Sequence, residues 1–167
     1  MATRRKYTIN EQKKNAPMDV ATNEHSLIFQ YGNTKYNTWD NWHLIPAAIP
    51  VIAQPNPTYT YVDIPGADGS MDITDYLVGR PTYSDRSGSF EFYVANDNGN
   101  WASRRAEIAS VLNGRKMRVY LTDDPQYYYE GRFFFRQWTP DASHSKVTIE
   151  YRVKPYRYLS NGKEAGL

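Results

Sequence analysis

The densest group of side chains with possible chemistry is a set of four carboxylates around a glycine-containing turn. Asp63, Asp68, Asp72 and Asp75 fall within one short segment. Carboxylates can hold calcium, but a calcium loop needs ligands at its first, third and fifth positions and a closing glutamate, and this segment lacks that spacing. We therefore interpret these residues as turn-forming and capping aspartates, and we expect neither a metal nor a cofactor.

The remaining candidates for catalysis are equally weak. His25, His43 and His144 lie in or beside polar segments without the spacing of metal ligands. There is no cysteine, which excludes thiolate sites and disulfides. A hydrolase needs a nucleophile with its base, or paired carboxylates, and phosphate-binding loops have a glycine pattern that is missing here. We predict that the protein is not an enzyme and has no catalytic residue.

Aromatic residues offer a second kind of site, a stacking platform for sugars or single-stranded nucleic acid. The candidates are Trp39, Trp42 and the run 127–129. Alternation along the strand places Tyr127 and Tyr129 inside and leaves Tyr128 outside, so we favour a role in the core. A carbohydrate-binding β-sandwich remains the alternative function, and a cell-wall hydrolase is a weaker one.

The first 25 residues are polar and basic, and we predict an extended arm. Residues 1–14 carry five cations, among them Arg4, Arg5 and Lys6, against one glutamate, whereas the rest of the chain is slightly acidic. Such an arm can bind the phosphates of nucleic acid or of a membrane. We favour a solvated segment that becomes ordered on a neighbouring subunit.

The elements that position these residues are mostly strands. Hydrophobic and polar residues alternate most strictly over 146–154, which predicts one buried and one solvated face. A helix is predicted over about 101–113, with Trp101 as its largest anchor and Gly114 just past its end. The 167 residues predict one antiparallel β-sandwich, 26–158, with one flanking helix and a C-terminal tail, 159–167. No apolar run is long enough to span a membrane.

Five segments, in order, resemble the distal tail protein family of long-tailed phages: residues 37–45, 61–74, 86–92, 112–117 and 123–132. The positions that carry the motifs are Trp39, Trp42, Ile64, Pro65, Gly66, Asp68, Gly69, Arg86, Gly114, Asp124, Pro125, Tyr129, Gly131 and Arg132. The match covers roughly 26–158 and does not include the galectin-like second domain that docks receptor-binding proteins in many members.

The resemblance implies a virion protein at the distal end or baseplate of a phage tail, assembled in the host cytoplasm. Its fold would be that of a tail tube protein, and six copies would form a ring around the channel through which DNA passes. Its partners would be itself, the tail tube protein above and hub or tip proteins below. Such a ring needs lateral contacts, and we expect them from the basic arm, the proline-rich stretch 46–57 and the loop 68–86. The candidate contact residues are Arg4, Arg5, Lys6, Pro46, Pro50, Pro55, Pro57, Asp68, Asp72, Tyr83 and Arg86.

Overall fold

The computed structural model describes residues 25–76, 78–94, 100–140 and 145–167. The predicted basic arm, with Arg4, Arg5 and Lys6, and the histidine at position 144 lie outside the described residues.

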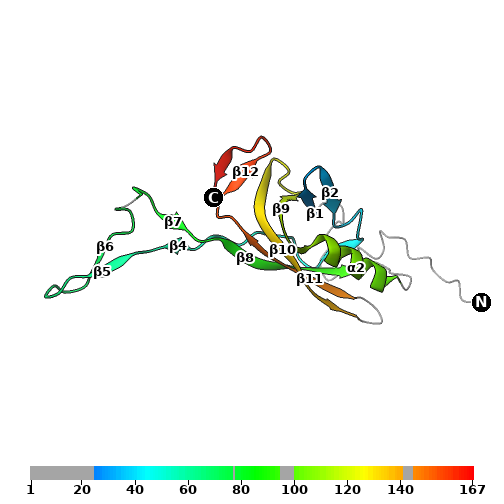
Figure 1. Ribbon diagram of the computed structural model, residues 1–167, viewed down its shortest axis with the longest axis horizontal. Helices are drawn as coiled ribbons and strands as arrows, with labels where there is room; N and C mark the ends of the chain where they lie inside the picture. The colour runs from blue at the N-terminus through cyan, green and yellow to red at the C-terminus, as the bar shows by residue number, and fades with distance from the viewer. Residues whose placement is uncertain (1–24, 77, 95–99, 141–144) are drawn as a thin grey trace, which may run out of the picture.

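An antiparallel sheet of nine strands forms the body of the protein (Figure 1). Its main path runs β2-β1-β9-β10-β11-β8-β3, and β12 and β13 extend it from β10. The strands are β1 (Leu27–Tyr31), β2 (Thr34–Asn37), β3 (Leu44–Pro46), β8 (Arg86–Val94), β9 (Asn113–Leu121), β10 (Tyr127–Thr139), β11 (Lys146–Val153), β12 (Arg157–Leu159) and β13 (Glu164–Gly166).

Alternation in the sequence explains the central strands. In β11, Val147, Ile149, Tyr151 and Val153 are all buried and the residues between them are more exposed, as the pattern predicts. The core lies on this inner side of the sheet.

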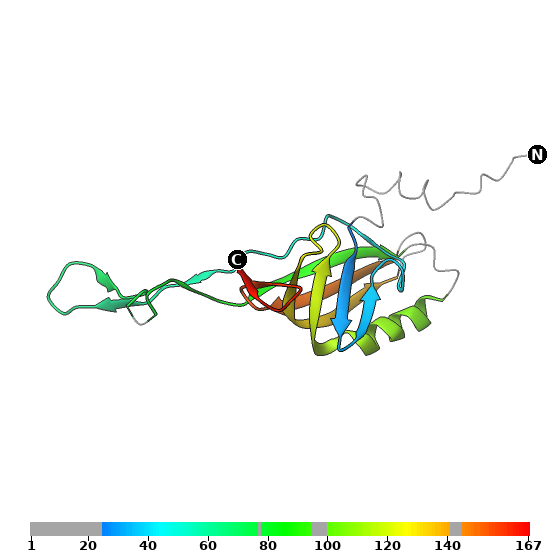
Figure 2. The same ribbon diagram turned by 90° about the horizontal axis from the view of Figure 1, so that it is seen from above.

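The sheet curves so that strands from its two ends cover one core (Figure 2). Phe29 of β1 packs edge-on against Phe133 of β10, with ring centroids 5.0 Å apart, and it also meets Trp42 at 6.0 Å. These rings therefore pack together in the core across β9, the strand between β1 and β10. The predicted fold class, mainly β and antiparallel with a flanking helix, is confirmed.

The chain turns between β2 and β3 instead of continuing as one strand. The Asn37 side-chain carbonyl accepts a hydrogen bond from the Trp39 amide (2.8 Å), and the Asn41 side chain accepts one from the Asn37 amide (2.7 Å). Such local bonds compete with strand pairing. The turn carries Trp42 into the core, where it is fully buried.

Helix α2 (Trp101–Val111) closes one side of the core through Ile108 and Val111. Trp101, the predicted anchor, is 43% exposed, so that prediction was wrong. Trp101 lies on the same side of the helix as Ile108. The spacing in the sequence, however, does not show how far the sheet extends beneath the helix along its axis. Within the described chain, no helix has the length and apolarity needed to cross a membrane.

The predicted C-terminal tail contributes instead to a hairpin, β12–β13, that pairs with the start of β10. This hairpin covers Tyr128, which we predicted to face outward. Tyr128 does point away from the main core, but it is only 3% exposed, because Tyr120 and Tyr158 pack against its ring at centroid distances of 5.5 Å. An outward side chain is thus buried under added strands.

Candidate functional site

Residues 56–84, here called the arm, leave the body as a narrow two-stranded ribbon (Figures 1 and 2). At its base β4 (Pro57–Thr58) pairs with β7 (Thr82–Tyr83), and farther out β5 (Tyr61–Asp63) pairs with β6 (Ser70–Asp72). The β-branched and aromatic residues of 59–64 form part of this ribbon, in which every residue of β5 and β6 is exposed.

Local chemistry at the tip explains why the chain reverses there. Gly66 and Gly69 adopt positive φ angles of 85° and 81°, which other residues rarely reach. The Ala67 amide donates to the Ile64 carbonyl across the turn (3.1 Å). The motif residues Ile64, Pro65, Gly66, Asp68 and Gly69 therefore form the tip of the arm.

Two of the four aspartates stabilise the arm. Asp63 accepts a hydrogen bond from the Ser70 hydroxyl (2.7 Å), and Asp72 accepts one from the Thr74 amide (2.9 Å). Hydrogen bonds from Thr74 hold the pKa of Asp72 below its usual value. In the part of the chain that the structure describes, no group of three or more His, Cys, Asp or Glu side chains is arranged to hold a metal ion.

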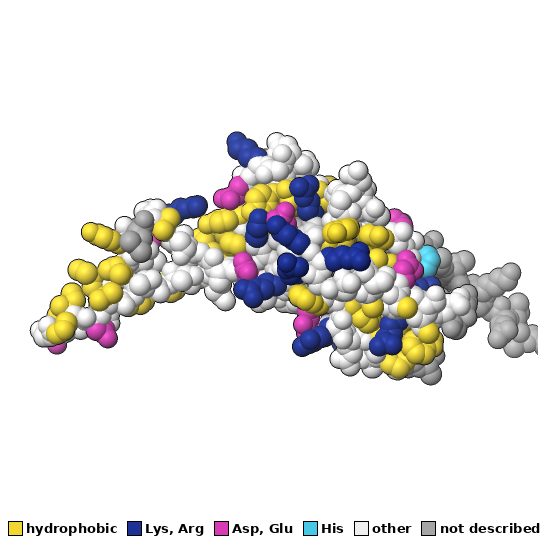
Figure 3. Space-filling view, viewed as in Figure 1, with side chains coloured by type: hydrophobic (Ala, Val, Ile, Leu, Met, Phe, Trp, Pro, Cys, Tyr) yellow, Lys and Arg dark blue, Asp and Glu magenta, His cyan; other side chains and the backbone are white. Residues whose placement is uncertain are grey.

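The surface of the arm is apolar and acidic. Tyr76 is 85% exposed, and large apolar side chains continue along the ribbon at Tyr59, Tyr61, Val62, Ile64, Met71 and Val78. No lysine or arginine occurs between residues 36 and 79, whereas all four aspartates of the predicted cluster lie there (Figure 3). Exposed apolar side chains at this density are typical of surfaces that bind a partner.

The root of the arm is fixed by Arg86, which is only 2% exposed. Its Nε donates to the Pro155 carbonyl (2.7 Å) and its Nη1 to the Ala53 carbonyl (3.1 Å). The guanidinium also lies 5.3 Å from the centre of the Tyr129 ring. Burial lowers the pKa of Arg86 from its ordinary value.

Tyr151 holds the other backbone group of Ala53. The Ala53 amide donates to the Tyr151 hydroxyl (2.9 Å), so both polar groups of this residue are bound by side chains from β8 and β11. Gly88 makes room for that hydroxyl, since a Cβ there would lie 2.5 Å from it. The ion pair between Asp85 and Arg152 (2.9 Å) adds to the same root. The arm therefore starts from a rigid base.

Several predicted contact residues are unavailable to a partner. Pro46, Pro50 and Pro55 are buried, because this stretch runs along β8. The Ala47 amide donates a hydrogen bond to the Glu91 carbonyl of β8 (2.8 Å). Arg86 is buried in the arm root. The proline-rich stretch is thus a strap whose prolines at 46, 50 and 55 are buried while Ile49 and Val51 are exposed. The prediction that these four residues form contacts was wrong, and contacts by the rest of the stretch stay a prediction. Pro57, Asp68, Asp72 and Tyr83 lie on the arm, with the first three exposed and Tyr83 partly buried.

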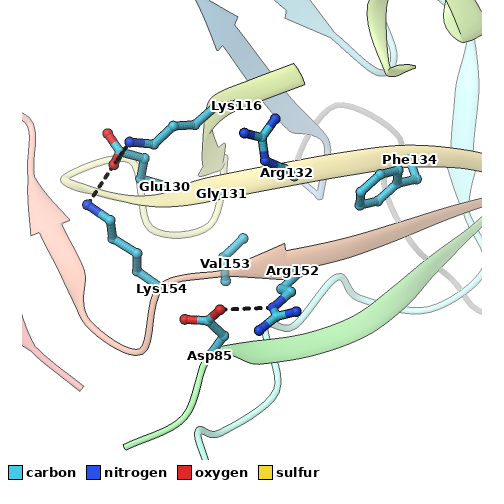
Figure 4. A pocket seen from close by; sticks show the side chains of 9 residues that line it. All are labelled: Asp85, Lys116, Glu130, Gly131, Arg132, Phe134, Arg152, Val153 and Lys154. Carbon is cyan, nitrogen blue, oxygen red and sulfur yellow. Dashed lines mark hydrogen bonds and ion pairs between the residues drawn. The ribbon is translucent and has the colours of Figure 1, made fainter. Parts of the chain in front are cut away.

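Charged side chains cover the outer face of the sheet beside the arm root (Figure 3). Glu130 bridges Lys154 (2.7 Å) and Lys116 (2.9 Å), and these lysines hold the pKa of Glu130 below its ordinary value. An open hollow of about 550 Å³ lies among these residues (Figure 4). Asp85, Lys116, Glu130, Gly131, Arg132, Phe134, Arg152, Val153 and Lys154 line it.

Gly131, a motif position, permits the strands at this hollow to approach. A Cβ at Gly131 would lie 2.2 Å from the Arg152 carbonyl oxygen and 2.5 Å from the Val153 Cα. Of the other motif residues, Trp42 is in the core, Asp124 and Pro125 form the turn before β10, and Tyr129 lies beside Arg86. Gly114, expected just past the helix, adopts a positive φ of 82° within β9.

The described histidines take part in local structure. His25 Nδ1 lies 2.8 Å from Asp123 Oδ2 and links the start of the body to the β9–β10 turn. His43 packs edge-on against Trp39, with ring centroids 5.9 Å apart.

Comparison with solved structures relates the fold to a phage protein. The chain is similar to the Dit protein (gp 19.1) of phage SPP1, which is described as a paradigm of the hub adsorption apparatus in phages that infect Gram-positive bacteria. The TM-score is 0.52 at 19% sequence identity, and the match covers 80% of this chain. It covers 52% of the Dit chain, so the protein spans about half the length of that neighbour. No family model and no curated protein matches the sequence.

Proposed function

We propose that the protein is a non-enzymatic structural component of a phage tail, a distal tail or baseplate adaptor whose arm contacts the adjacent subunit. Copies of the chain form a ring, six by the resemblance, that encloses the DNA channel. The tail tube protein lies above the ring, and hub or tip proteins lie below it. DNA is met only in transit, and no cofactor is required.

The observation that carries this proposal is the arm, a ribbon with an apolar surface and a fixed root. Gly66 in the turn lies ten residues beyond Asn56 at the arm root, which at about 3.3 Å per residue gives a reach of about 30 Å. A body of about 120 residues has a radius of gyration of about 14 Å. The arm is therefore long enough to lie across a neighbouring body. The similarity to the SPP1 protein and the motifs shared with distal tail proteins support the same assignment.

The arm can be removed while the hydrogen bonds of Arg86 and Tyr151 at its root stay in place. The Ser84 amide donates to the Asn56 carbonyl (2.9 Å), so residues 57–83 can be replaced by a short Gly-Ser turn between these two residues. The matched control keeps the ribbon and changes only its surface, through Tyr61→Ser and Tyr76→Ser. We expect the wild-type chain to sediment as a closed oligomer. The shortened variant should sediment as a folded monomer, and the double variant should associate more weakly.

Two results would overturn the proposal. One is a wild-type protein that stays monomeric at its highest soluble concentration. The other is a shortened variant that forms the same oligomer as the wild type. Unfolding curves of both variants, expected to match the wild type because the replaced residues lie outside the core, separate loss of association from loss of the fold.

A further inference from the structure

We propose that the acidic tip of the arm docks in the cationic hollow on the outer sheet face of the next copy. This inference rests on the proposed function, because it specifies where the arm of one subunit lands on another. The partner is a second copy of this chain, and the surface that receives it carries an excess of positive charge.

The strand register places like charges directly opposite one another in this hollow. Lys116 of β9 pairs with Arg132 of β10, and Arg132 pairs with Arg152 of β11. Three cations therefore stand in one row across three adjacent strands (Figure 4). Like charges at directly opposite positions destabilise a sheet. A subunit that keeps such a row gains stability when an anionic partner covers it.

Carboxylates within the subunit offset only part of this charge. Glu130 forms ion pairs with Lys116 and Lys154, and Asp85 forms one with Arg152. Arg132 instead donates to the Gly114 carbonyl (2.8 Å), and Arg118, opposite Glu130 in the register, lies over the Tyr128 ring at 4.7 Å. Among the described residues, neither Arg132 nor Arg118 has a carboxylate within 4.0 Å. The lining of the hollow holds four cations, Lys116, Arg132, Arg152 and Lys154, against two carboxylates, Asp85 and Glu130, which leaves a net charge of +2.

The outer part of the arm has the opposite charge and a matching apolar surface. Asp63, Asp68, Asp72 and Asp75 give residues 59–78 a charge of −4, with no cation among them. Phe134, which lines the hollow, is 40% exposed and can pack against the apolar side chains of the arm. Tip and hollow are thus complementary in charge and in polarity.

The geometry requires that tip and hollow come from different copies. Asp85, at the arm root, lines the hollow, and the ribbon projects from the root away from the body (Figures 1 and 2). An arm therefore cannot fold back into the hollow of its own subunit. Because the two surfaces are different patches, the contact is head-to-tail, which is the type that closes into a ring.

A charge reversal tests this assignment. Arg132→Glu puts a carboxylate between Lys116 and Arg152, so the fold should become no less stable while self-association weakens about tenfold or more. Asp68→Lys at the tip should weaken association by a similar factor and leaves the hydrogen bonds of Asp63 and Asp72 in place. The double variant should recover an affinity within a few fold of the wild type. Arg105→Glu, an exposed reversal on α2, is the control and should change little.

Sedimentation at low and high salt measures the self-association of each variant, and the shortened-arm protein is measured in parallel. If the shortened arm abolishes association but Arg132→Glu leaves it unchanged, the arm docks elsewhere, so this inference fails while the proposed function stands. Failure of the Asp68→Lys, Arg132→Glu double variant to recover affinity would also overturn it. So would Arg132→Glu abolishing binding of a fluorescent duplex DNA without changing association, because the face would then be a polyanion site.

Discussion

Arg86 should contribute more to stability than any other charged residue at the arm root, and Arg86→Met tests this. Methionine keeps the length and apolar stem of the side chain but removes both hydrogen bonds to the Pro155 and Ala53 carbonyls. Hydrogen bonds from a charged donor contribute about 1.5–3 kcal/mol each, which gives roughly 3–6 kcal/mol for the pair before desolvation.

The burial of the guanidinium offsets part of this gain. Burial disfavours its charged form, and its Nη2 atom has no hydrogen-bond partner among the residues that the structure describes. We therefore expect Arg86→Met to lower the free energy of unfolding by about 2–3 kcal/mol. Arg86→Lys keeps the charge but has a single donor group, and it should lose about half as much.

Urea unfolding followed by tryptophan fluorescence measures both variants, since Trp42 and Trp138 are buried in the core. Hydrogen exchange adds a local readout, because the Ala53 amide, bonded to the Tyr151 hydroxyl, should exchange faster when the root loosens. A loss below about 0.5 kcal/mol for Arg86→Met would refute the reasoning, because it would mean that the two carbonyls do not depend on Arg86.

Further substitutions test the packing and the charges of the body. Gly131→Ala should cost about 3 kcal/mol or more in urea unfolding, because its Cβ would meet backbone atoms of the neighbouring strand, and a loss below about 1 kcal/mol would contradict the strand spacing. Ile108→Ala should lower the free energy of unfolding by about 2–4 kcal/mol, whereas Trp101→Ala at the exposed start of α2 should lower it by under about 1 kcal/mol. Equal losses would show that Trp101 does anchor the helix. Glu130→Gln should destabilise by about 1 kcal/mol or less at neutral pH. Because Lys154 and Lys116 lower the folded-state pKa of Glu130, this contribution is complete above its ordinary value of 4.5 and disappears as pH falls through the lowered value. A difference in unfolding free energy between Glu130→Gln and the wild type that grows as the pH falls would contradict this prediction.

The sequence predicted the body well because its strands have one buried and one solvated face. Val147 to Val153 alternate without exception, and each apolar member is buried. Alternation shows only that two faces differ, however. Strand-forming residues do not by themselves show burial either, since Tyr61–Asp63 is a strand in which every residue is exposed.

The features that define the site depend on contacts that are distant in sequence. Arg86 begins an amphipathic strand and therefore looks like a surface residue until the strap residue Ala53 and the loop residue Pro155 close over it. The row of Lys116, Arg132 and Arg152 exists only once the register of three strands is known. One local signal was present, since the absence of lysine and arginine between residues 36 and 79 separates the arm from the charged body.

No local feature of the sequence indicates that the prolines at 46, 50 and 55 are buried, which explains why the prediction for them was wrong. Four prolines in the stretch 46–57 exclude helix and central strand, but they do not exclude burial of their rings. Ile52, between them, is 4% exposed and belongs to the core, so the strap is an integral part of the body.

The mass of the purified wild-type chain in solution, measured together with negative-stain images, tests self-assembly most directly. We predict a closed oligomer, six copies by the resemblance, seen as rings with an open centre. A solitary subunit at every concentration, able to bind a glycan or cleave peptidoglycan, would contradict it.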